Sequence, residues 1–417
     1  MGVPSYILVV QNIRPYQSAL GGLIALAAAI GIGRFVYTPI LPPMVEALGL
    51  SKAAAGLIAS ANFLGYLLGA LLAAWPNLPG RRRVWLLGAL AVSGATTAGM
   101  GLVQTMPPFL ALRLLGGAAS AVVLVLASAM VLETLVETRR PGLSALHFAG
   151  VGTGITVSAI LVAGLLRASQ PWQSLWLASG GVSLLATIAV ALLLRDAPAP
   201  ASLADQRAGP PPHSGLASLI AAYGLFGFGY VITATFIVAI VRGTPAIRPL
   251  EPVIWIVFGV AAVPSVAVWT WIADRRGIPM AFAAACVIEA CGVLASVAWR
   301  SELGIFVAAI LVGGTFMGLT ALGLVRARAL ASGDPRAVLA LMTASFGLGQ
   351  IIGPSFAGVL SDRLGNFTVP SVVAALALLL AGGLVLSPRP HPTSGAAGAG
   401  RPTRRGDAPA PSSVPRR

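Results

Sequence analysis

Twelve apolar stretches, each long enough to cross a lipid bilayer, follow one another along the chain. A helix that crosses the hydrocarbon core needs about 20 mostly apolar residues, because the core is about 30 Å thick and each residue adds about 1.5 Å. Only 9% of the residues are charged, compared with about 25% in a soluble domain. The sequence therefore predicts an all-α polytopic membrane protein. The expected spans are 18–42, 53–75, 84–103, 109–132, 143–166, 172–194, 216–241, 253–273, 280–299, 303–325, 337–360 and 367–387.

The first six stretches recur in the second half of the chain at an offset of 196 or 197 residues. Gly31 in the first stretch returns as Gly227 in the seventh, and Gly116 in the fourth returns as Gly313 in the tenth. Because six is an even number of spans, both copies have the same orientation in the membrane. The repeat predicts two six-helix bundles that are parallel copies, related by an axis along the membrane normal.

Composition divides the chain into five parts. We expect a short cytoplasmic amino terminus over 1–17, a first bundle over 18–194 and a second bundle over 216–387. Residues 195–215, which contain several prolines and charged residues, form a polar cytoplasmic linker between the bundles. Residues 388–417 are rich in Pro, Gly, Ala and Arg and have no apolar period, so we expect a disordered basic cytoplasmic tail that favours anionic lipid headgroups.

The net charge of +15 is distributed unevenly between the loops. If the amino terminus is cytoplasmic, nineteen of the 27 Lys and Arg residues lie on the cytoplasmic side and six lie outside. The positive-inside rule therefore places both termini in the cytoplasm. Membrane topology explains the positive charge without a nucleic-acid partner, and we expect a multi-pass protein of a bacterial inner membrane.

One loop carries a recognisable signature. Residues 274–277, Asp-Arg-Arg-Gly, resemble the Asp-Arg-x-Gly loop that members of the major facilitator superfamily carry after their second and eighth helices. The copy after the second span is degraded, because Asn77 and Leu78 replace the acid and the first arginine, which leaves Gly80, Arg81 and Arg82. In the fourth span, residues 113–117 resemble the Arg-x-x-x-Gly motif of the same superfamily.

Two further segments, 31–39 in the first span and 223–230 in the seventh, resemble the YbfB/YjiJ-type branch of that superfamily. Together with the twelve spans and the repeat, the resemblance covers residues 18–387. It implies the major facilitator fold and secondary active transport by alternating access. It also implies that helices one, four, seven and ten line a central cavity.

The signature loop is a candidate gate. The carboxylate of Asp274 could accept hydrogen bonds from free amides at the start of a neighbouring helix, or pair with Arg275. Such a latch would hold one access state and break in the other. The alternative is that basic loops simply stay on the cytoplasmic side. The gating candidates are Asp274, Arg275, Gly277, Gly80 and Arg81.

Few ionisable residues lie deep in the spans, where a charge costs about 2.5 to 3.5 kcal/mol and normally faces a cavity or a partner. Arg34 lies well inside the first span, and its alternative partner is a helix-end carbonyl. Arg113 and His147 lie about one turn inside their spans, so both could reach the interface instead. By the resemblance, the cavity side chains that bind substrate are Arg34, Tyr37, Thr38, Arg113, Tyr230 and Thr233.

Two residues are candidates for proton coupling. Glu289 lies near the middle of the ninth span, and a buried carboxyl favours the protonated form that a proton carrier needs. The alternative is a protonated, hydrogen-bonded glutamic acid without a transport role. His147 titrates near neutrality in water. A proton is therefore a candidate co-substrate.

The favoured function is secondary active transport of a small organic solute. Among helices one, four, seven and ten, Arg34 is the deep charge, so an anionic or zwitterionic substrate suits the cavity better than a cation. Efflux of neutral or cationic drugs or metabolites, and a non-transporting sensor with a transporter fold, are the alternatives.

Other function classes lack their sequence features. A channel needs a continuous polar stripe, and an enzyme needs a catalytic constellation, which three scattered histidines and two cysteines do not supply. Cys286 and Cys291 are five residues apart on different helix faces, so neither a disulfide nor a metal site is expected. We expect no cofactor, no metal and no obligate protein partner, only a small-molecule substrate and the lipid bilayer.

Overall fold

The computed structural model describes residues 5–75, 79–194, 215–331 and 335–387. The expected linker before Gly215, the expected tail and the Asn77–Leu78 part of the degraded loop lie outside the described residues. The described chain is helical and contains twelve helices long and apolar enough to cross a membrane. The predicted fold class, an all-α polytopic protein with twelve spans, is thereby confirmed.

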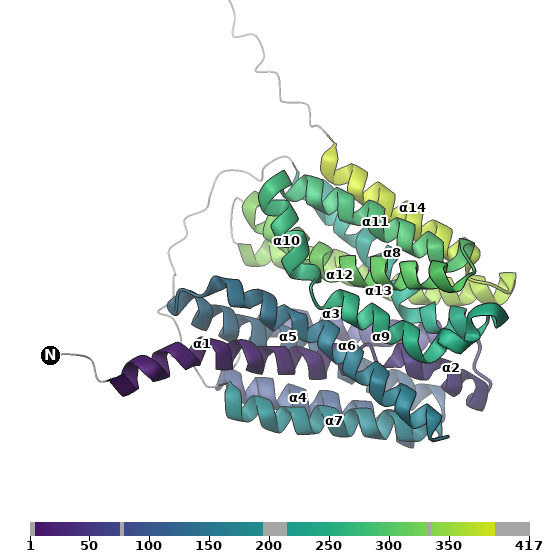
Figure 1. Ribbon diagram of the computed structural model, residues 1–417, viewed down its shortest axis with the longest axis horizontal. Helices are drawn as coiled ribbons and strands as arrows, with labels where there is room; N and C mark the ends of the chain where they lie inside the picture. Colours follow the sequence, from purple (N-terminus) through teal and green to yellow (C-terminus); the bar gives the residue numbers. More distant parts are fainter. Residues whose placement is uncertain (1–4, 76–78, 195–214, 332–334, 388–417) are drawn as a thin grey trace, which may run out of the picture. The chain divides into compact units, whose positions relative to one another are not determined.

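The first bundle holds six spans, of which the first is interrupted and the others are single long helices, some extended by a short turn. In chain order its elements are α1 (Ser5–Leu26), η1 (Ala27–Ile32), α2 (Tyr37–Leu48), α3 (Lys52–Ala73), α4 (Arg82–Gly99), η2 (Met100–Leu102), α5 (Met106–Glu137), η3 (Pro141–Leu143), α6 (Ser144–Arg167) and α7 (Trp172–Leu193). Figure 1 draws them in purple to teal. The first helix begins at Ser5, so helix already covers most of the expected amino-terminal segment.

The second bundle has the same plan, except that its second span is interrupted. Its elements are α8 (Leu216–Arg242), η4 (Pro245–Leu250), α9 (Glu251–Ala262), α10 (Ser265–Arg276), α11 (Ile278–Ala298), α12 (Glu302–Leu330), α13 (Pro335–Leu364) and α14 (Thr368–Leu386). Pro264, directly before α10, explains the break between α9 and α10. These elements are green to yellow in Figure 1.

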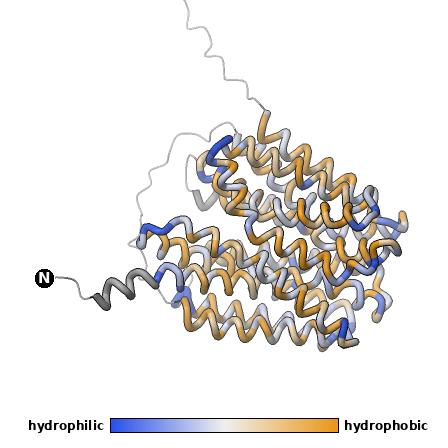
Figure 2. Tube along the Cα trace, in the orientation of Figure 1, coloured by the Kyte–Doolittle hydropathy of each residue, from blue (hydrophilic) through white to orange (hydrophobic). Residues whose placement is uncertain are grey.

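Figure 2 shows apolar residues along the helices and hydrophilic residues at the helix ends, as expected for helices that cross a membrane. Two names are used below for the two ends of the helices. The near end is the one at which α1 begins and α14 ends. The far end is the opposite one, at which α2, α8 and α13 end and α3 begins.

The two bundles meet through two matched pairs of helices, α3 with α13 and α6 with α9. The repeat exchanges these pairs, because it relates α3 to α9–α10 and α6 to α13. Glycines allow the close approach that helices in lipid depend on. A Cβ on Gly152 of α6 would lie 2.5 Å from the backbone nitrogen of Val263, and one on Gly56 of α3 would overlap the carbonyl of Pro354.

Repeat-related residues also touch each other directly. Thr38 of α2 donates a hydrogen bond of 2.7 Å to the carbonyl of Ala234 in α8. Arg242 at the end of α8 forms an ion pair with Glu46 of α2. Each pair is separated by 196 residues, which is the repeat offset. The predicted parallel repeat is therefore visible as contacts between equivalent positions of the two copies.

Candidate substrate site and gates

The first span is broken at the segment that carries Arg34. The helix widens into the π-helix η1, where Gly33 and Phe35 donate to carbonyls five residues earlier, and then passes through a turn over 33–36. A Cβ on Gly31 would lie 2.5 Å from the Cα of Gly154, so glycine is needed for α6 to pack here. Wide turns inside helices leave backbone carbonyls without their usual partners and are frequent at functional sites.

Arg113 of α5 supplies the missing partners. Its guanidinium donates 3.1 Å hydrogen bonds to the carbonyls of Gly33 and Arg34, and lies over the ring of Tyr37 at 5.0 Å. Arg113 is 4% exposed, so the expectation that it could reach the interface is wrong. Two backbone acceptors hold the side chain inside the bundle. Arg113 therefore positions the broken segment.

Arg34 itself is buried among aromatic rings. Its guanidinium carbon lies 4.4 Å from the ring centre of Tyr66 and 4.6 Å from that of Phe63, both on α3. Cation–π contacts of this kind stabilise a desolvated cation. Its Nε and Nη2 atoms are buried and have no hydrogen-bond partner among the described residues. The carbonyls of Gly33 and Arg34, where the helix breaks, are bonded to Arg113.

Tyr37 and Thr38, also predicted to bind substrate, use their hydroxyl groups to join helices. Tyr37 donates a 2.8 Å hydrogen bond to the carbonyl of Ala55 in α3, and Thr38 bonds to α8 as described above. Both residues are buried. In this state their hydroxyl protons are already engaged.

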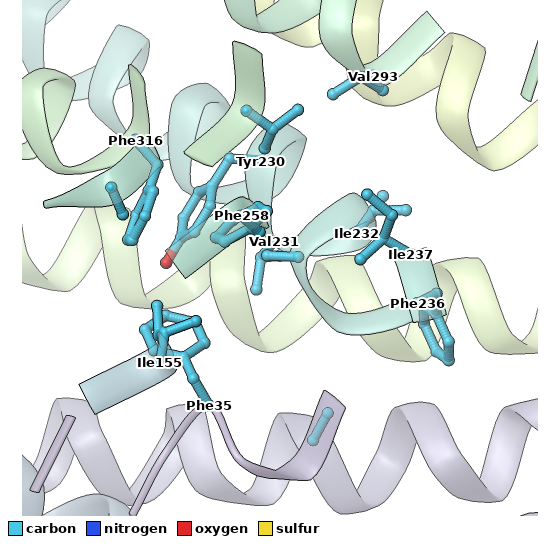
Figure 3. Close-up of a cluster of buried hydrophobic side chains, with 14 of the residues drawn as sticks. Phe35, Ile155, Tyr230, Val231, Ile232, Phe236, Ile237, Phe258, Val293 and Phe316 are labelled. Atoms are coloured by element: carbon cyan, nitrogen blue, oxygen red, sulfur yellow. The ribbon is translucent and has the colours of Figure 1, made fainter. Parts of the chain in front are cut away.

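The second bundle faces Arg34 with an aromatic stack centred on Tyr230. Its ring is nearly parallel to those of Phe316 on α12, at 5.6 Å, and Phe346 on α13, at 5.9 Å. Phe316 in turn meets Phe35 of the first bundle edge to face at 5.9 Å. Figure 3 shows the phenolic oxygen of Tyr230 pointing toward Phe35 and Ile155. The structure thus brings Tyr230 and the Arg34 segment to the same interface.

Gln350 of α13 is a site residue that the sequence interpretation missed. It is fully buried and its amide nitrogen donates to the hydroxyl of Tyr230. Its Oε1, and the hydroxyl of Thr233 one turn along α8, have no partner among the described residues. A carboxamide in the middle of an apolar span was the signal that could have identified it.

Glu289 and His147 occupy different surroundings. Glu289 of α11 is fully buried, and its carboxyl group lies beside the hydroxyl of Thr315 on α12. It lies within electrostatic reach of Tyr230. His147 of α6 is fully buried, with Nε2 2.9 Å from the hydroxyl of Ser128 and its ring against Gly22. The expectation that His147 could reach the interface is therefore wrong, because it packs between α1 and α5.

At the near end, the signature loop has its expected shape but no latch contact. Gly277 joins α10 to α11 with φ of +81°, a conformation that favours glycine. Asp274 is exposed and pairs with no residue that the structure describes. Arg275 lies over the ring of Trp271 at 3.6 Å, so the expected alternative pairing with Asp274 does not form.

In the equivalent loop of the first bundle, Gly80 and Arg81 are exposed. The next residue, Arg82, binds both carboxyl oxygens of Glu133 on α5, at 2.9 and 3.0 Å. The ion pair of this loop therefore stays within one bundle. It does not join the two halves in this state.

At the far end, by contrast, a carboxylate joins the bundles. Asp362, at the end of α13, accepts hydrogen bonds from the backbone amides of Lys52 and Ala53 at the start of α3, at 3.0 and 2.8 Å. The Lys52 ammonium donates to the carbonyls of Ser361 and Gly365. Arg242 adds its ion pair with Glu46 across the interface.

All hydrogen bonds and ion pairs between the two bundles, among the residues that the structure describes, lie in the far half of the helices. Besides those above they include the hydroxyl of Ser60 on α3, which donates to the carbonyl of Ile351 at 2.6 Å and meets the hydroxyl of Ser355 at 2.8 Å. The interface is therefore polar and latched at the far end only.

A family model described as "Uncharacterised MFS-type transporter YbfB" matches residues 26–386. That is most of the chain. The chain belongs to this family of MFS transporters. Its membership confirms the predicted resemblance to the YbfB/YjiJ-type branch. The protein is therefore a multi-pass membrane transporter of the MFS type.

Individual relatives of this MFS transporter are more distant. It is 27% identical over 386 residues to a "Chloramphenicol resistance protein" of Streptomyces lividans, which covers 86% of this chain and 94% of that protein. The crystal structure of the nucleoside transporter NupG superposes with a TM-score of 0.68 at 15% identity, covering 89% of this chain and 98% of that chain. These matches establish the fold.

A bacterial homologue of the human lysosomal transporter Spinster, in an inward-facing and occupied conformation, is also similar in fold. It superposes with a TM-score of 0.66 at 15% identity, and the match covers 92% of this chain and 97% of that chain.

Proposed function

We propose that this MFS transporter moves a small anionic or zwitterionic organic solute across a bacterial inner membrane by alternating access. The observation that carries the proposal is Arg34. Arg34 is 6% exposed, and two of its guanidinium nitrogen atoms, Nε and Nη2, have no hydrogen-bond partner among the residues that the structure describes. A carboxylate supplies two acceptors in the planar geometry that an arginine fork matches.

The free donors of Arg34 are Nε and Nη2, which lie on one edge of the guanidinium group. This edge presents two roughly parallel N–H bonds to a carboxylate. The rings of Phe63 and Tyr66 flank the cation at 4.6 and 4.4 Å. Arg113 fixes the backbone carbonyls of Gly33 and Arg34. The guanidinium group of Arg34 is therefore held in place before an anion binds.

The proposed topology assigns each end of the helices to one side of the membrane. With both termini in the cytoplasm, as the loop charges indicate, the far end faces the periplasm. The Asp362 and Arg242 contacts then close the periplasmic side. The structure would therefore be the state from which the substrate exchanges with the cytoplasm. Proton coupling, with Glu289 as the first candidate and His147 as the second, belongs to the same proposal.

The relative from Streptomyces lividans favours a second candidate function, export of an uncharged drug. Chloramphenicol is a neutral aromatic compound, and the stack around Tyr230 offers it aromatic contact. The two candidates differ in how they depend on Arg34. Export of an uncharged compound needs the rings but not the guanidinium.

Binding measurements on the purified protein distinguish the candidates. Ligands that bind the native state raise its melting temperature, so a panel of carboxylates is compared with the matching primary amides and with chloramphenicol. Hits are then followed as flux into proteoliposomes. We expect carboxylates but not amides to stabilise the wild type. Arg34→Lys should weaken binding by losing the fork, and Arg34→Ala should abolish it.

Arg363→Ala is the matched control, because Arg363 is exposed at the end of α13 and its loss removes one arginine elsewhere. It should bind as the wild type does. Transport of a carboxylate by Arg34→Ala at the wild-type rate would refute the proposal. Stabilisation by chloramphenicol that is equal in the wild type and Arg34→Ala would support drug export instead.

A further inference from the structure

We propose that Tyr230 and Gln350 form the second half of the substrate site and bind a hydroxyl group on an aromatic carboxylate. The inference rests on the proposed function, since Arg34 supplies the half that binds the carboxylate. It adds a substrate class to that function: a planar aromatic ring with a carboxylate at one end and a hydroxyl group at the other.

The first observation is the hydrogen-bonding state of the pair. Gln350 donates its amide N–H to the Tyr230 oxygen, so the phenolic proton of Tyr230 is free to be donated elsewhere. The amide oxygen of Gln350 is buried and unpartnered among the described residues. Side by side, the pair therefore offers one donor and one acceptor. A hydroxyl group both accepts and donates, and so satisfies both atoms at once.

The unused hydrogen-bonding groups of Tyr230 and Gln350 point to a ligand because both residues are buried. Both residues are almost completely enclosed, at 0% exposure for Gln350 and 2% for Tyr230. Buried polar atoms in native proteins are nearly always hydrogen-bonded, and exceptions call for an explanation. The hydroxyl of Thr233, one turn along α8, is also buried without a partner among the described residues. A polar ligand group that enters between the bundles would satisfy atoms that the protein alone does not.

The second observation is the chain of rings between the two halves of the site. The Arg34 guanidinium carbon lies 5.3 Å from the ring centre of Phe35. Phe35 meets Phe316 edge to face at 5.9 Å, and Phe316 lies parallel to Tyr230 at 5.6 Å. A flat ring that parts Phe35 from Phe316 replaces one aromatic contact by another. A saturated ring or branched chain of the same size would lose it.

The probes are para-hydroxybenzoate, benzoate, cyclohexanecarboxylate and para-hydroxybenzamide, titrated against the full-length protein in lipid nanodiscs by calorimetry. We expect para-hydroxybenzoate to bind about tenfold more tightly than benzoate, which is about 1.4 kcal/mol. Cyclohexanecarboxylate should bind more weakly than benzoate, and the neutral amide should not bind measurably.

Tyr230→Phe keeps the ring and its stacking but removes the hydroxyl group. We expect the ratio of its affinities for para-hydroxybenzoate and benzoate to fall from about ten in the wild type to about one. Gln350→Leu should lose the same preference. The control is Tyr223→Phe, because Tyr223 is another buried tyrosine on α8, its hydroxyl bonds the Thr320 carbonyl at 3.0 Å and its ring stacks on Phe346 at 4.9 Å. It should keep the preference.

Failure of this inference is separable from failure of the proposed function. Equal affinities for para-hydroxybenzoate and benzoate, both lost in Arg34→Ala, would overturn the Tyr230–Gln350 subsite and leave the anion site standing. Arg34-dependent binding of cyclohexanecarboxylate alone would overturn the aromatic requirement. Binding of the neutral amide that survives Arg34→Ala would overturn both. Absence of binding by both aromatic carboxylates would overturn the inference.

Discussion

Replacing Asp362 by alanine should open the far end of the transporter. The carboxylate bridges the bundles by accepting two hydrogen bonds from the first backbone amides of α3. It acts as a helix cap supplied by the other bundle. Because the contact exists only when the far end is closed, its loss destabilises that state relative to the state open at the far end.

The size of the effect follows from the contact. Loss of a side-chain cap costs about 0.5 to 2 kcal/mol, and an anion at a helix amino terminus contributes about 0.3 to 1 kcal/mol. Asp362 is exposed, so salt screens part of the charge term. The loss of Asp362 therefore costs the state closed at the far end about 1 to 2 kcal/mol. This changes the ratio of molecules open at the far end to molecules closed there about 5- to 30-fold. The fraction of molecules open at the far end should rise by that factor.

Labelling of a buried cysteine measures this fraction. Val238 of α8 is 1% exposed in the far half, so a Val238→Cys reporter reacts with an impermeant maleimide only when the far end opens. The background lacks the native thiols at Cys286 and Cys291. Asp362→Ala should speed labelling about 5- to 30-fold at constant reagent, provided that opening is fast compared with labelling.

Ser51→Ala is the matched control. Ser51 directly precedes α3 and caps the same helix, because its hydroxyl accepts a 3.0 Å hydrogen bond from the amide of Ala54. That contact is local and is kept when the bundles part, so its loss should lower the melting temperature without changing the labelling rate. Equal labelling of Asp362→Ala and the wild type, with Ser51→Ala destabilised, would show that the Asp362 contact does not hold the far end closed.

Three further outcomes are expected. Gly31→Ala should lower the melting temperature or prevent folding, because its Cβ would meet the backbone of Gly154. Gly164→Ala is the control and should not lower it, because the space around Gly164 is open. Equal melting temperatures of the two variants would contradict the packing of α6 against the first span. Arg113→Ala should lower the melting temperature, and Arg113→Lys should not restore it, because one ammonium replaces a fork on two carbonyls; full rescue by lysine would contradict the positioning role. Asp274→Asn should slow labelling at Val238→Cys by destabilising the state closed at the near end, and an unchanged rate would contradict the near-end latch.

The spans and the repeat could be predicted because they depend on local properties. Membrane insertion is decided by the hydropathy of about 20 consecutive residues, and a repeat is visible at a fixed offset. The break at Gly33–Val36 left only a weak signal, the glycines of the 31–39 segment. A helix of average composition continues through such residues. Here the break persists because Arg113, 79 residues further on, satisfies the carbonyl of Arg34.

The candidate site was predicted in part. The depth of Arg34 in its span identified it, because a charge in hydrocarbon needs an explanation. The partners of Tyr230 were not identified, since Phe316 and Phe346 look like ordinary apolar residues of a membrane span. Gln350 was visible as a polar residue but gained its meaning only from the helix packed against it. Contacts between helices decide which buried polar atoms lack a hydrogen-bond partner. These contacts cannot be predicted from the spans taken one at a time.

The same four-residue pattern marks both ends of the transporter. Asp362-Arg363-Leu364-Gly365 ends α13 at the far end, as Asp274-Arg275-Arg276-Gly277 ends α10 at the near end. Gly365 and Gly277 both have positive φ, +76° and +81°, so each helix stops in the same way and leaves its aspartate on the last turn.

In this state Asp362 caps the start of α3, while Asp274 pairs with no residue that the structure describes. Alternating access requires that contacts at one end break as those at the other end form. If Asp274 forms an equivalent cap when the near end closes, the two contacts would offset each other and keep both states within a few kcal/mol, the range in which a bound substrate can shift the balance.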